Sequence, residues 1–430
     1  MLVRFEWQAV DCFQCGDKVM TPKLDLAFVR SQFPAFKEPS LAGQAFFDNA
    51  GGSYACQSVI DHLDQYYRET KLQPYHLHPA AQKAGAQMDL AHERLASYLN
   101  VKASEVHLGP STSQNTYVLA QAFGKILKAG DEVIVTNQDH EANIGVWRAL
   151  ESRGIVIKEW QVDTQTGSLD INDLETLFTE QTKLLAFTHC SNIVAEINPV
   201  AEICALAKAA GVATLVDGVS FAGHGLPDVN ALGADIYLLS LYKAYGTHLG
   251  VMVIRDAMAD KLGNQAHYFN KAYRQKWFVP AGPDHAQVAA SRGVLDYFDA
   301  LHDHHFDTTG SVIEKVQRVR GLLHDAEQGL LVKLLRFVDQ HPKLILLGTA
   351  DPSKRAATVA IIPKGQTPQE LAQKLVDQGI ICGAGHFYAV RLLEAMGVDA
   401  ATGVVRLSFV HYTNAEEIDQ LIEALDKALS

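Results

Sequence analysis

The feature that most constrains the fold is a regular alternation of short apolar runs with helix-length stretches between residues 103 and 255. The runs are EVHLG (105–109), DEVIVT (131–136), IVIKEW (155–160), KLLAFTH (183–189), ATLVDGV (213–219), DIYLLSL (235–241) and GVMVIR (250–255). This alternation predicts βαβ units and a mostly parallel sheet that is covered on both faces. Right-handed crossovers bring the carboxyl ends of parallel strands to one edge, so polar side chains that follow these runs are candidates for a ligand site.

Beyond about residue 300 the pattern changes to a long helical segment, several shorter strand-like runs and an amphipathic helix at the C-terminus. We therefore expect an α/β protein with two domains. A large domain over residues 25–300 would hold a mostly parallel seven-stranded sheet, and residues 301–430 would form a smaller α+β domain.

The first 24 residues do not resemble the rest of the chain. We interpret residues 1–24 as an N-terminal arm, which is either disordered or the product of an upstream start. Met20 precedes a short amphipathic helix that we expect to pack on the smaller domain. Cys12 and Cys15 have the spacing of a zinc knuckle or a redox pair, but no second close Cys/His pair follows them. Because a structural zinc ion needs four ligands, we expect no metal site.

The composition argues against several functional classes. A net charge of −12 and a pI near 5.8 do not suit a surface that binds nucleic acid or an anionic membrane. No apolar run approaches the roughly 20 residues that span a bilayer. The six cysteines are scattered along the chain instead of forming a disulfide framework, which favours a cytoplasmic protein.

Polar residues follow four of the apolar runs. The segment GPSTSQN (109–115) runs into a predicted helix, whose free N–H groups suit a phosphate, although Ser/Thr residues there also serve as N-caps. His140, Asp217 and Lys243 each come at or just after the end of a further run. Each has an ordinary alternative, namely a structural histidine, a capping aspartate and a lysine whose stem packs on apolar surface.

Taken together, these residues meet one chemical demand. A pyridoxal phosphate enzyme needs a lysine for the Schiff base, an acid that keeps the pyridine nitrogen protonated, a phosphate cradle and a planar group against the ring. We therefore expect pyridoxal 5′-phosphate as the cofactor.

With these residues, the chain resembles the class V aminotransferases, a family of the fold-type I pyridoxal phosphate enzymes, and specifically their cysteine-desulfurase-like branch. The resemblance runs from about Phe46 to Asp419. The motifs that carry it are FFDNAGGS (46–53), STSQ (111–114), DHEANIGVW (139–147), THCSNIVAEINPV (188–200), VDGVSFAGH (216–224), SLYKAYG (240–246) and VVRLSFVHYTNAEEID (404–419). The resemblance implies the fold-type I fold and a homodimer.

The resemblance also implies a role for each matched residue. Lys243 would form the aldimine and act as base, His140 would stack on the pyridine ring, and Asp217 would pair with the pyridine nitrogen. The other cofactor-binding residues would be Thr112, Ser113, Asn192, Ser220, Ser240 and Tyr242. The substrate-binding residues would be Arg406 and Asn192 for the carboxylate, together with Asn49, His386 and Tyr388.

Several positions depart from the family pattern. Ser220 stands where many members have glutamine, Tyr242 where many have histidine, and Pro283 where a threonine reaches phosphate across a dimer interface. In GIICGAGHFYAVRL (379–392), Gly383 and Tyr388 occupy the positions of a second arginine and of the sulfur-accepting cysteine. The nearby Cys382 precedes the loop turn and suits a small core residue.

These departures favour transamination or elimination from a small amino acid over desulfuration. Cysteine desulfurase or selenocysteine lyase activity is the nearest alternative. A nucleotide-binding α/β enzyme is a second alternative, but the chain lacks a convincing G-x-G-x-x-G motif or P-loop. A catalytically silent cofactor-binding regulatory or scaffold protein is a third alternative, and the presence of both Lys243 and Arg406 argues against it.

Overall fold

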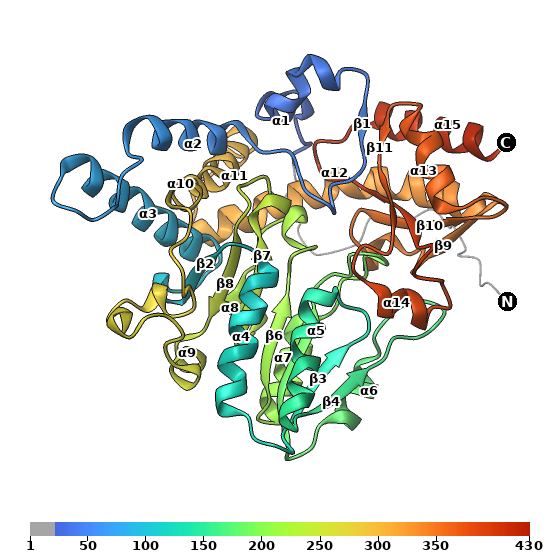
Figure 1. Ribbon diagram of the computed structural model, residues 1–430. Coiled ribbons are helices and arrows are strands. Elements are labelled where there is room, and N and C mark those ends of the chain that lie inside the picture. Colours follow the sequence, from blue (N-terminus) through green and yellow to red (C-terminus); the bar gives the residue numbers. More distant parts are fainter. Residues whose placement is uncertain (1–21) are drawn as a thin grey trace.

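The computed structural model describes residues 22–430 and contains three sheets (Figure 1). The largest has seven strands in the order β2-β8-β7-β6-β5-β3-β4. Its strands are β2 (Val106–Gly109), β3 (Glu132–Thr136), β4 (Val156–Trp160), β5 (Thr182–Thr188), β6 (Ala213–Asp217), β7 (Ile236–Ser240) and β8 (Gly250–Ile254). Strands β4, β3, β5, β6 and β7 are parallel, whereas β8 runs antiparallel to both of its neighbours.

Both faces of this sheet are buried, because successive side chains of a strand point to opposite faces. On β5, Leu185 and Phe187 join one apolar cluster, which includes residues of α7 (Val200–Ala209). Leu184 and Ala186 join a second cluster, which includes residues of α4 (Thr112–Ile126). The mostly parallel, doubly covered sheet predicted from the sequence is confirmed.

The second sheet has four antiparallel strands in the order β12-β13-β10-β9. These strands are β9 (Leu344–Leu347), β10 (Thr358–Pro363), β12 (Gly383–Gly385) and β13 (Val404–Ser408). Strand β1 (Ala45–Phe46) pairs with β11 (Ile380–Ile381), which brings the start of the described chain beside this C-terminal unit. The predicted domain boundary near residue 300 falls within α11 and stays a prediction.

Helices of very different length connect and cover the sheets. The other helices are α1 (Leu26–Ser31), α2 (Gln57–Glu69), α3 (Pro79–Tyr98), α5 (Gly145–Arg148), α6 (Ile171–Leu177), α8 (Val229–Leu232), α9 (Asp256–Leu262), α10 (His285–Ala290), α11 (Arg292–His305), α12 (Val312–Gln340), α13 (Pro368–Val376), α14 (Val390–Ala395) and α15 (Ala415–Leu429). Arg30 of α1 donates to the carbonyl of Tyr412 at 3.0 Å and pairs with Glu417 of α15. The N-terminal helix therefore contacts the C-terminal part of the chain.

Within residues 22–430, no helix is long and apolar enough to cross a membrane. Cys12 and Cys15 lie outside the described residues.

Strand β8 approaches the start of α4 closely at one edge of the large sheet. Gly250 pairs with Gly109 on one side and with Ser240 on the other. A Cβ atom at Gly250 would lie 2.5 Å from both the carbonyl carbon of Ser111 and the backbone nitrogen of Thr112. Only a residue without a side chain leaves room for α4 to begin against this strand.

We expect the Gly250→Ala variant to lose about 1–3 kcal/mol of unfolding free energy, because the added methyl group must displace backbone atoms. Urea unfolding followed by circular dichroism measures the loss. The matched control is Gly329→Ala on α12, where an added Cβ meets no atom within 4 Å. That change should stabilise the protein by up to about 1 kcal/mol. Equal stabilities for the two variants would contradict this account of the β8–α4 contact.

Candidate active site

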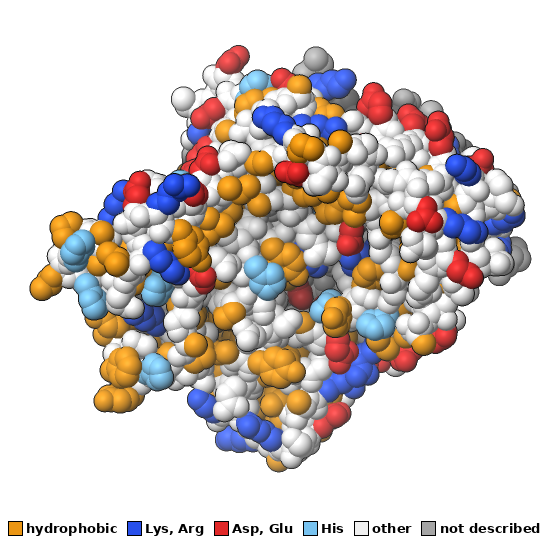
Figure 2. All heavy atoms as spheres, turned by 45° about the horizontal axis from the view of Figure 1, so that its top comes forward, with side chains coloured by type: hydrophobic (Ala, Val, Ile, Leu, Met, Phe, Trp, Pro, Cys, Tyr) orange, Lys and Arg blue, Asp and Glu red, His pale blue; other side chains and the backbone are white. Residues whose placement is uncertain are grey.

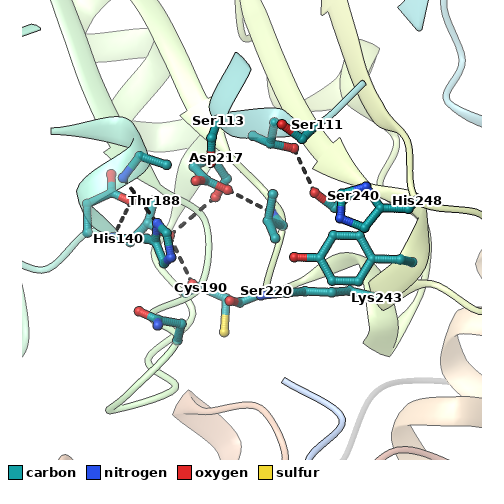
Figure 3. Close-up of a pocket in the computed structure, with 16 residues that line it drawn as sticks. Ser111, Ser113, His140, Thr188, Cys190, Asp217, Ser220, Ser240, Lys243 and His248 are labelled. Carbon is teal, nitrogen blue, oxygen red and sulfur yellow. Dashed lines mark hydrogen bonds between the residues drawn. The ribbon is translucent and has the colours of Figure 1, made fainter. Parts of the chain in front are cut away.

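A cavity of about 260 Å³ opens where β3, β5, β6 and β7 end. Ser240, Asp217 and His140 come from or just after different strands and surround the same space (Figure 3). In the space-filling view, histidine side chains gather around a central hollow on this face (Figure 2). The expectation that polar residues after the strands meet at one edge is therefore correct.

One wall of the cavity is the start of α4. Ser111 caps this helix, since its side chain accepts a hydrogen bond from the backbone N–H of Gln114. The Thr112 hydroxyl lies 2.7 Å from the Ser240 hydroxyl and donates to the carbonyl of Leu239 at 3.2 Å. The first N–H groups of a helix have no partner within the helix and carry a partial positive charge. This wall therefore offers hydroxyl and N–H donors to an anion.

Two buried carboxyl groups, those of Asp217 and Asp139, also line the cavity. Asp217 ends β6 and accepts one hydrogen bond, from the backbone N–H of Val219 at 2.8 Å. Asp139 accepts from the Asn143 amide at 2.7 Å and from the backbone N–H of His140 at 3.0 Å. Burial raises the pKa of both carboxyl groups, and the charge of Asp217 raises the pKa of Asp139 further. A cationic partner would offset the cost of ionising Asp217.

Lys243 enters the cavity from the 3₁₀ turn Leu241–Lys243 that follows β7. Burial, and after it the positive charge of Arg406, lower the pKa of its ammonium group from 10.5 to about 8, while Asp217 opposes the shift. A neutral amine is therefore accessible near neutral pH, as a nucleophile or a base requires.

His140 presents a planar neutral ring. Its Nδ1 accepts a hydrogen bond from the backbone N–H of Ala142 at 3.1 Å. Burial, followed by the charges of Lys243 and Arg406, lowers its pKa to about 4. The ring of Tyr388 lies 5.2 Å from that of His140, centroid to centroid. His140 lines the cavity, and Tyr388 contacts it from a distant part of the chain.

Arg406 lies close to this group of residues and is almost fully buried, with 3% of its surface exposed. Its Nη2 forms an ion pair with Asp48 at 3.2 Å, and its Nη1 donates to the carbonyl of Asn192 at 3.4 Å. The Phe387 ring stacks on the guanidinium at 3.9 Å. The Nε of Arg406 has no hydrogen-bond partner among the described residues. Arg406 therefore retains donor capacity for a carboxylate.

The residues present fit the expected cofactor in three respects. The start of α4 lines the cavity with the hydroxyl residues Ser111, Thr112 and Ser113, which suits a phosphate. The Asn192 Oδ1 is buried and has no hydrogen-bond partner in residues 22–430. Asp217 has one backbone donor and a raised pKa, which suits a protonated ring nitrogen. Phosphate, hydroxyl and pyridine nitrogen would each find a complementary group here.

The structure brings all nine residues predicted to bind the cofactor to this one cavity, namely Thr112, Ser113, His140, Asn192, Asp217, Ser220, Ser240, Tyr242 and Lys243. Asn49 does not line it, because its amide bonds to the Ser408 carbonyl and the Tyr412 hydroxyl. His386 and Tyr388 lie exposed on the neighbouring loop. The binding roles of all these residues stay predictions.

Sequence reasoning missed three residues. Asp139 is fully buried beside His140, and its position directly before that histidine in the sequence was an available signal. His248 stacks on Tyr242 at 4.7 Å, with ring planes 7° apart. Asp48 pairs with Arg406, which lies 358 positions later in the chain, so no local sequence pattern could indicate that contact.

No thiol in this region is activated. Cys190 lines the cavity and Cys382 lies before the loop, and burial raises the pKa of each to about 12. Because the thiolate is the nucleophile, neither cysteine is prepared to accept sulfur. Tyr388, which the sequence analysis assigned to the position of the sulfur-accepting cysteine, is exposed on this loop.

We expect Lys243 of the cofactor-free protein to titrate near pH 8, and two variants to shift its pKa in opposite directions. Arg406→Gln removes a positive charge and should raise the pKa, whereas Asp217→Asn removes a negative charge and should lower it. The pH dependence of lysine acetylation, followed by peptide mass spectrometry, measures both shifts. The exposed Lys183 serves as internal control and should not change. A Lys243 midpoint near 10.5 in the unaltered protein would contradict the effect of burial.

Comparison with known proteins shows the family to which the chain belongs. The family described as "Aminotransferase class-V" matches residues 45–421. The "Aminotransferase-like protein FGM3" of Gibberella zeae is 32% identical, over 93% of this chain and 98% of its own length. A cysteine desulfurase of Serratia proteamaculans is 29% identical, over 93% of this chain and 97% of its own length.

Solved structures agree in fold. The apo cysteine desulfurase of Thermococcus onnurineus covers 95% of this chain and 98% of its own, at 23% identity and a TM-score of 0.83. The Escherichia coli cysteine desulfurase CsdA covers 94% and 98%, at 24% identity and a TM-score of 0.79. These structures confirm the fold-type I architecture, and the match to the aminotransferase family and its relatives confirms the cofactor predicted from the sequence. The chain therefore belongs to the class V aminotransferase family of pyridoxal phosphate-dependent enzymes.

Proposed function

We propose that the protein acts on a small α-amino acid, by transferring its amino group or by eliminating a substituent from its β-carbon. The observation that carries this proposal is the lowered pKa of Lys243 in a cavity that also holds Asp217 and adjoins Arg406. Bound pyridoxal phosphate supplies an electrophilic carbon for the amine and an electron sink for the carbanion at Cα.

Different residues of the chain would hold the phosphate, contact the pyridine ring and move the proton at Cα. The Ser240 and Thr112 hydroxyls and the start of α4 would hold the phosphate. An ionised Asp217 would accept a hydrogen bond from the ring N–H, and the neutral ring of His140 would lie against the pyridine face. Lys243, with a pKa of about 8, would accept the Cα proton on its Nζ atom and then donate that proton to another atom of the reacting molecule.

Arg406 would bind the substrate carboxylate. In the structure its Nη2 is engaged by Asp48, whose side chain is 36% exposed. A substrate carboxylate would therefore exchange with a partly exposed carboxylate instead of meeting a free guanidinium. This exchange selects for a negatively charged group next to the reacting amine, as an α-amino acid presents.

Elimination or transamination fits better than desulfuration. Transfer of sulfur to the enzyme needs a thiolate near the substrate, and the pKa of both nearby cysteines is about 12. Phe387 occupies the space beside Gly383, since a Cβ there would lie 3.3 Å from its Cε1 atom. The ring of Phe387 thus covers Arg406 on the side where the family pattern has a second arginine.

We further propose a homodimer. Several large apolar side chains around the α3 start and residues 268–273 are strongly exposed, including Leu77 (94%), Tyr268 (88%) and Phe269 (64%). In Figure 2, apolar side chains gather at the left edge of this face. Exposed aromatic clusters of this kind commonly mark protein–protein interfaces.

Borohydride reduction of the holoenzyme should fix the cofactor on Lys243, because that amine is the only lysine nitrogen lining the cavity among residues 22–430. The visible absorbance band should disappear, and mass spectrometry should find the adduct on the Lys243 peptide. Lys243→Ala should give neither the reducible band nor the adduct, whereas Lys183→Ala should behave like the unaltered protein. An adduct on another lysine, or none after full reconstitution, would refute the assignment.

Arg406→Gln should weaken amino-acid binding by about 10–100-fold, because a charge-assisted contact to a carboxylate contributes about 1.5–3 kcal/mol. The change in visible absorbance on adding L-alanine or L-cysteine measures the dissociation constant. Asp48→Asn should tighten binding, since the substrate then displaces no ion pair. If Arg406→Gln binds both amino acids as well as the unaltered protein, Arg406 does not hold the carboxylate.

A further inference from the structure

A second cavity, of about 330 Å³, lies on the far side of the segment that follows Asp217. Residues of the 3₁₀ turn Ala222–His224, of α12 and of the segment 355–357 line it. Val219 and Ser220 line the first cavity, and Phe221 and His224 line the second, so one short segment separates the two. None of the residues assigned above to cofactor or substrate lines this second cavity.

Arg355, which lines it, is a buried cation without an acidic partner. Only 1% of its surface is exposed. Its Nη groups donate to the backbone carbonyls of Thr349 and, at 2.6 Å, Thr358, and its Nε has no hydrogen-bond partner. No carboxylate within residues 22–430 forms an ion pair with it. Burial lowers the pKa of Arg355 to about 10, so it is charged at neutral pH. An uncompensated buried charge is costly, and a bound anion would offset that cost.

Arg320 of α12 brings a second guanidinium to the same cavity. Its aliphatic stem packs on Gly225, where the backbone has a φ of +131° and a Cβ would lie 2.7 Å from the Arg320 Cγ. The glycine therefore makes room for the stem. No hydrogen bond or ion pair from residues 22–430 reaches the Arg320 guanidinium, although its charge lowers the pKa of His189 after the larger effect of burial.

The one carboxylate that lines the cavity is already engaged. Glu327 lies 2.6 Å from His224 Nδ1 and accepts from the backbone N–H of His411 at 3.1 Å. Arg320 and Arg355 thus have no acidic partner among residues 22–430, although the protein as a whole has a net charge of −12. The rest of the lining is largely apolar and includes Phe221 and Leu331.

We propose that this cavity binds a small organic anion. Its carboxylate or phosphate group would bind Arg320 and Arg355, and its apolar part would pack against Phe221 and Leu331. The volume is within the range of pockets that hold small metabolites, and guanidinium groups suit both kinds of anion. This site is separate from that of the proposed reaction and rests on none of its steps.

Calorimetric titration of the holoenzyme with benzoate, phenyl phosphate and inorganic phosphate tests the proposal. At least one organic anion should bind saturably, and more tightly than inorganic phosphate, because its ring fills the apolar part of the cavity. Arg320→Gln should weaken this binding by about tenfold or more. Arg318→Gln, on the same helix but outside the lining, is the matched control and should leave it unchanged.

Absence of saturable binding, or equal binding by Arg320→Gln and the unaltered protein, would overturn the proposal. Equal binding would place the anion elsewhere, for example on Arg406. Holoenzyme crystals soaked with para-bromobenzoate give a test that needs no variant. An anomalous bromine peak beside Arg355 and Phe221 is expected, and a peak confined to the first cavity would refute the assignment.

Discussion

The burial of several charged groups beside one another is the constraint on which the rest of this structure depends. Lys243, Asp217 and Arg406 are each costly to bury alone, and each changes the cost for the others. Burial, with the charge of Arg406 acting in the same direction and that of Asp217 against it, leaves Lys243 with a pKa of about 8. The same electrostatics keep His140 neutral, with a pKa of about 4. A reactive amine and a planar neutral ring are both consequences of one desolvated cavity.

Such a cavity needs rigid walls, and the sheet provides them. Lys243 comes shortly after the fully buried strand β7, Asp217 ends β6, and Gly250 lets α4 start against β8. Strained backbone borders the same region. Tyr245, Phe387 and Tyr388 have φ values of 66°, 47° and 60°, in the left-handed region that residues with side chains rarely adopt. Strain of this kind persists where the surrounding structure imposes it, and it concentrates at functional sites.

The loop after β12 distinguishes this chain from the desulfurase pattern. Phe387 stacks on Arg406, and its backbone carbonyl accepts from the Asn192 amide at 2.8 Å. The strained residues therefore hold both groups proposed to bind the substrate carboxylate. Tyr388 lies beside His140, at the position that the resemblance to the family assigns to a sulfur acceptor. The loop would thus present aromatic surface in place of a nucleophile, next to the proposed carboxylate site.

Much of the fold and of the cofactor site could be predicted, because the signals are local. Short continuous apolar runs mark the buried strands, and a polar residue at or after the end of a run lies at the edge of the sheet, which is why His140, Asp217 and Lys243 could be found. The Arg406–Asp48 ion pair, the carboxyl pair of Asp139 and Asp217, and the cavity with Arg320 and Arg355 could not be found in this way. These groups come together only through packing of distant segments. The sequence alone determined the order of strands and helices and which reactive groups follow them. The tertiary structure decided which charges share a buried space, because desolvation depends on everything that surrounds a group.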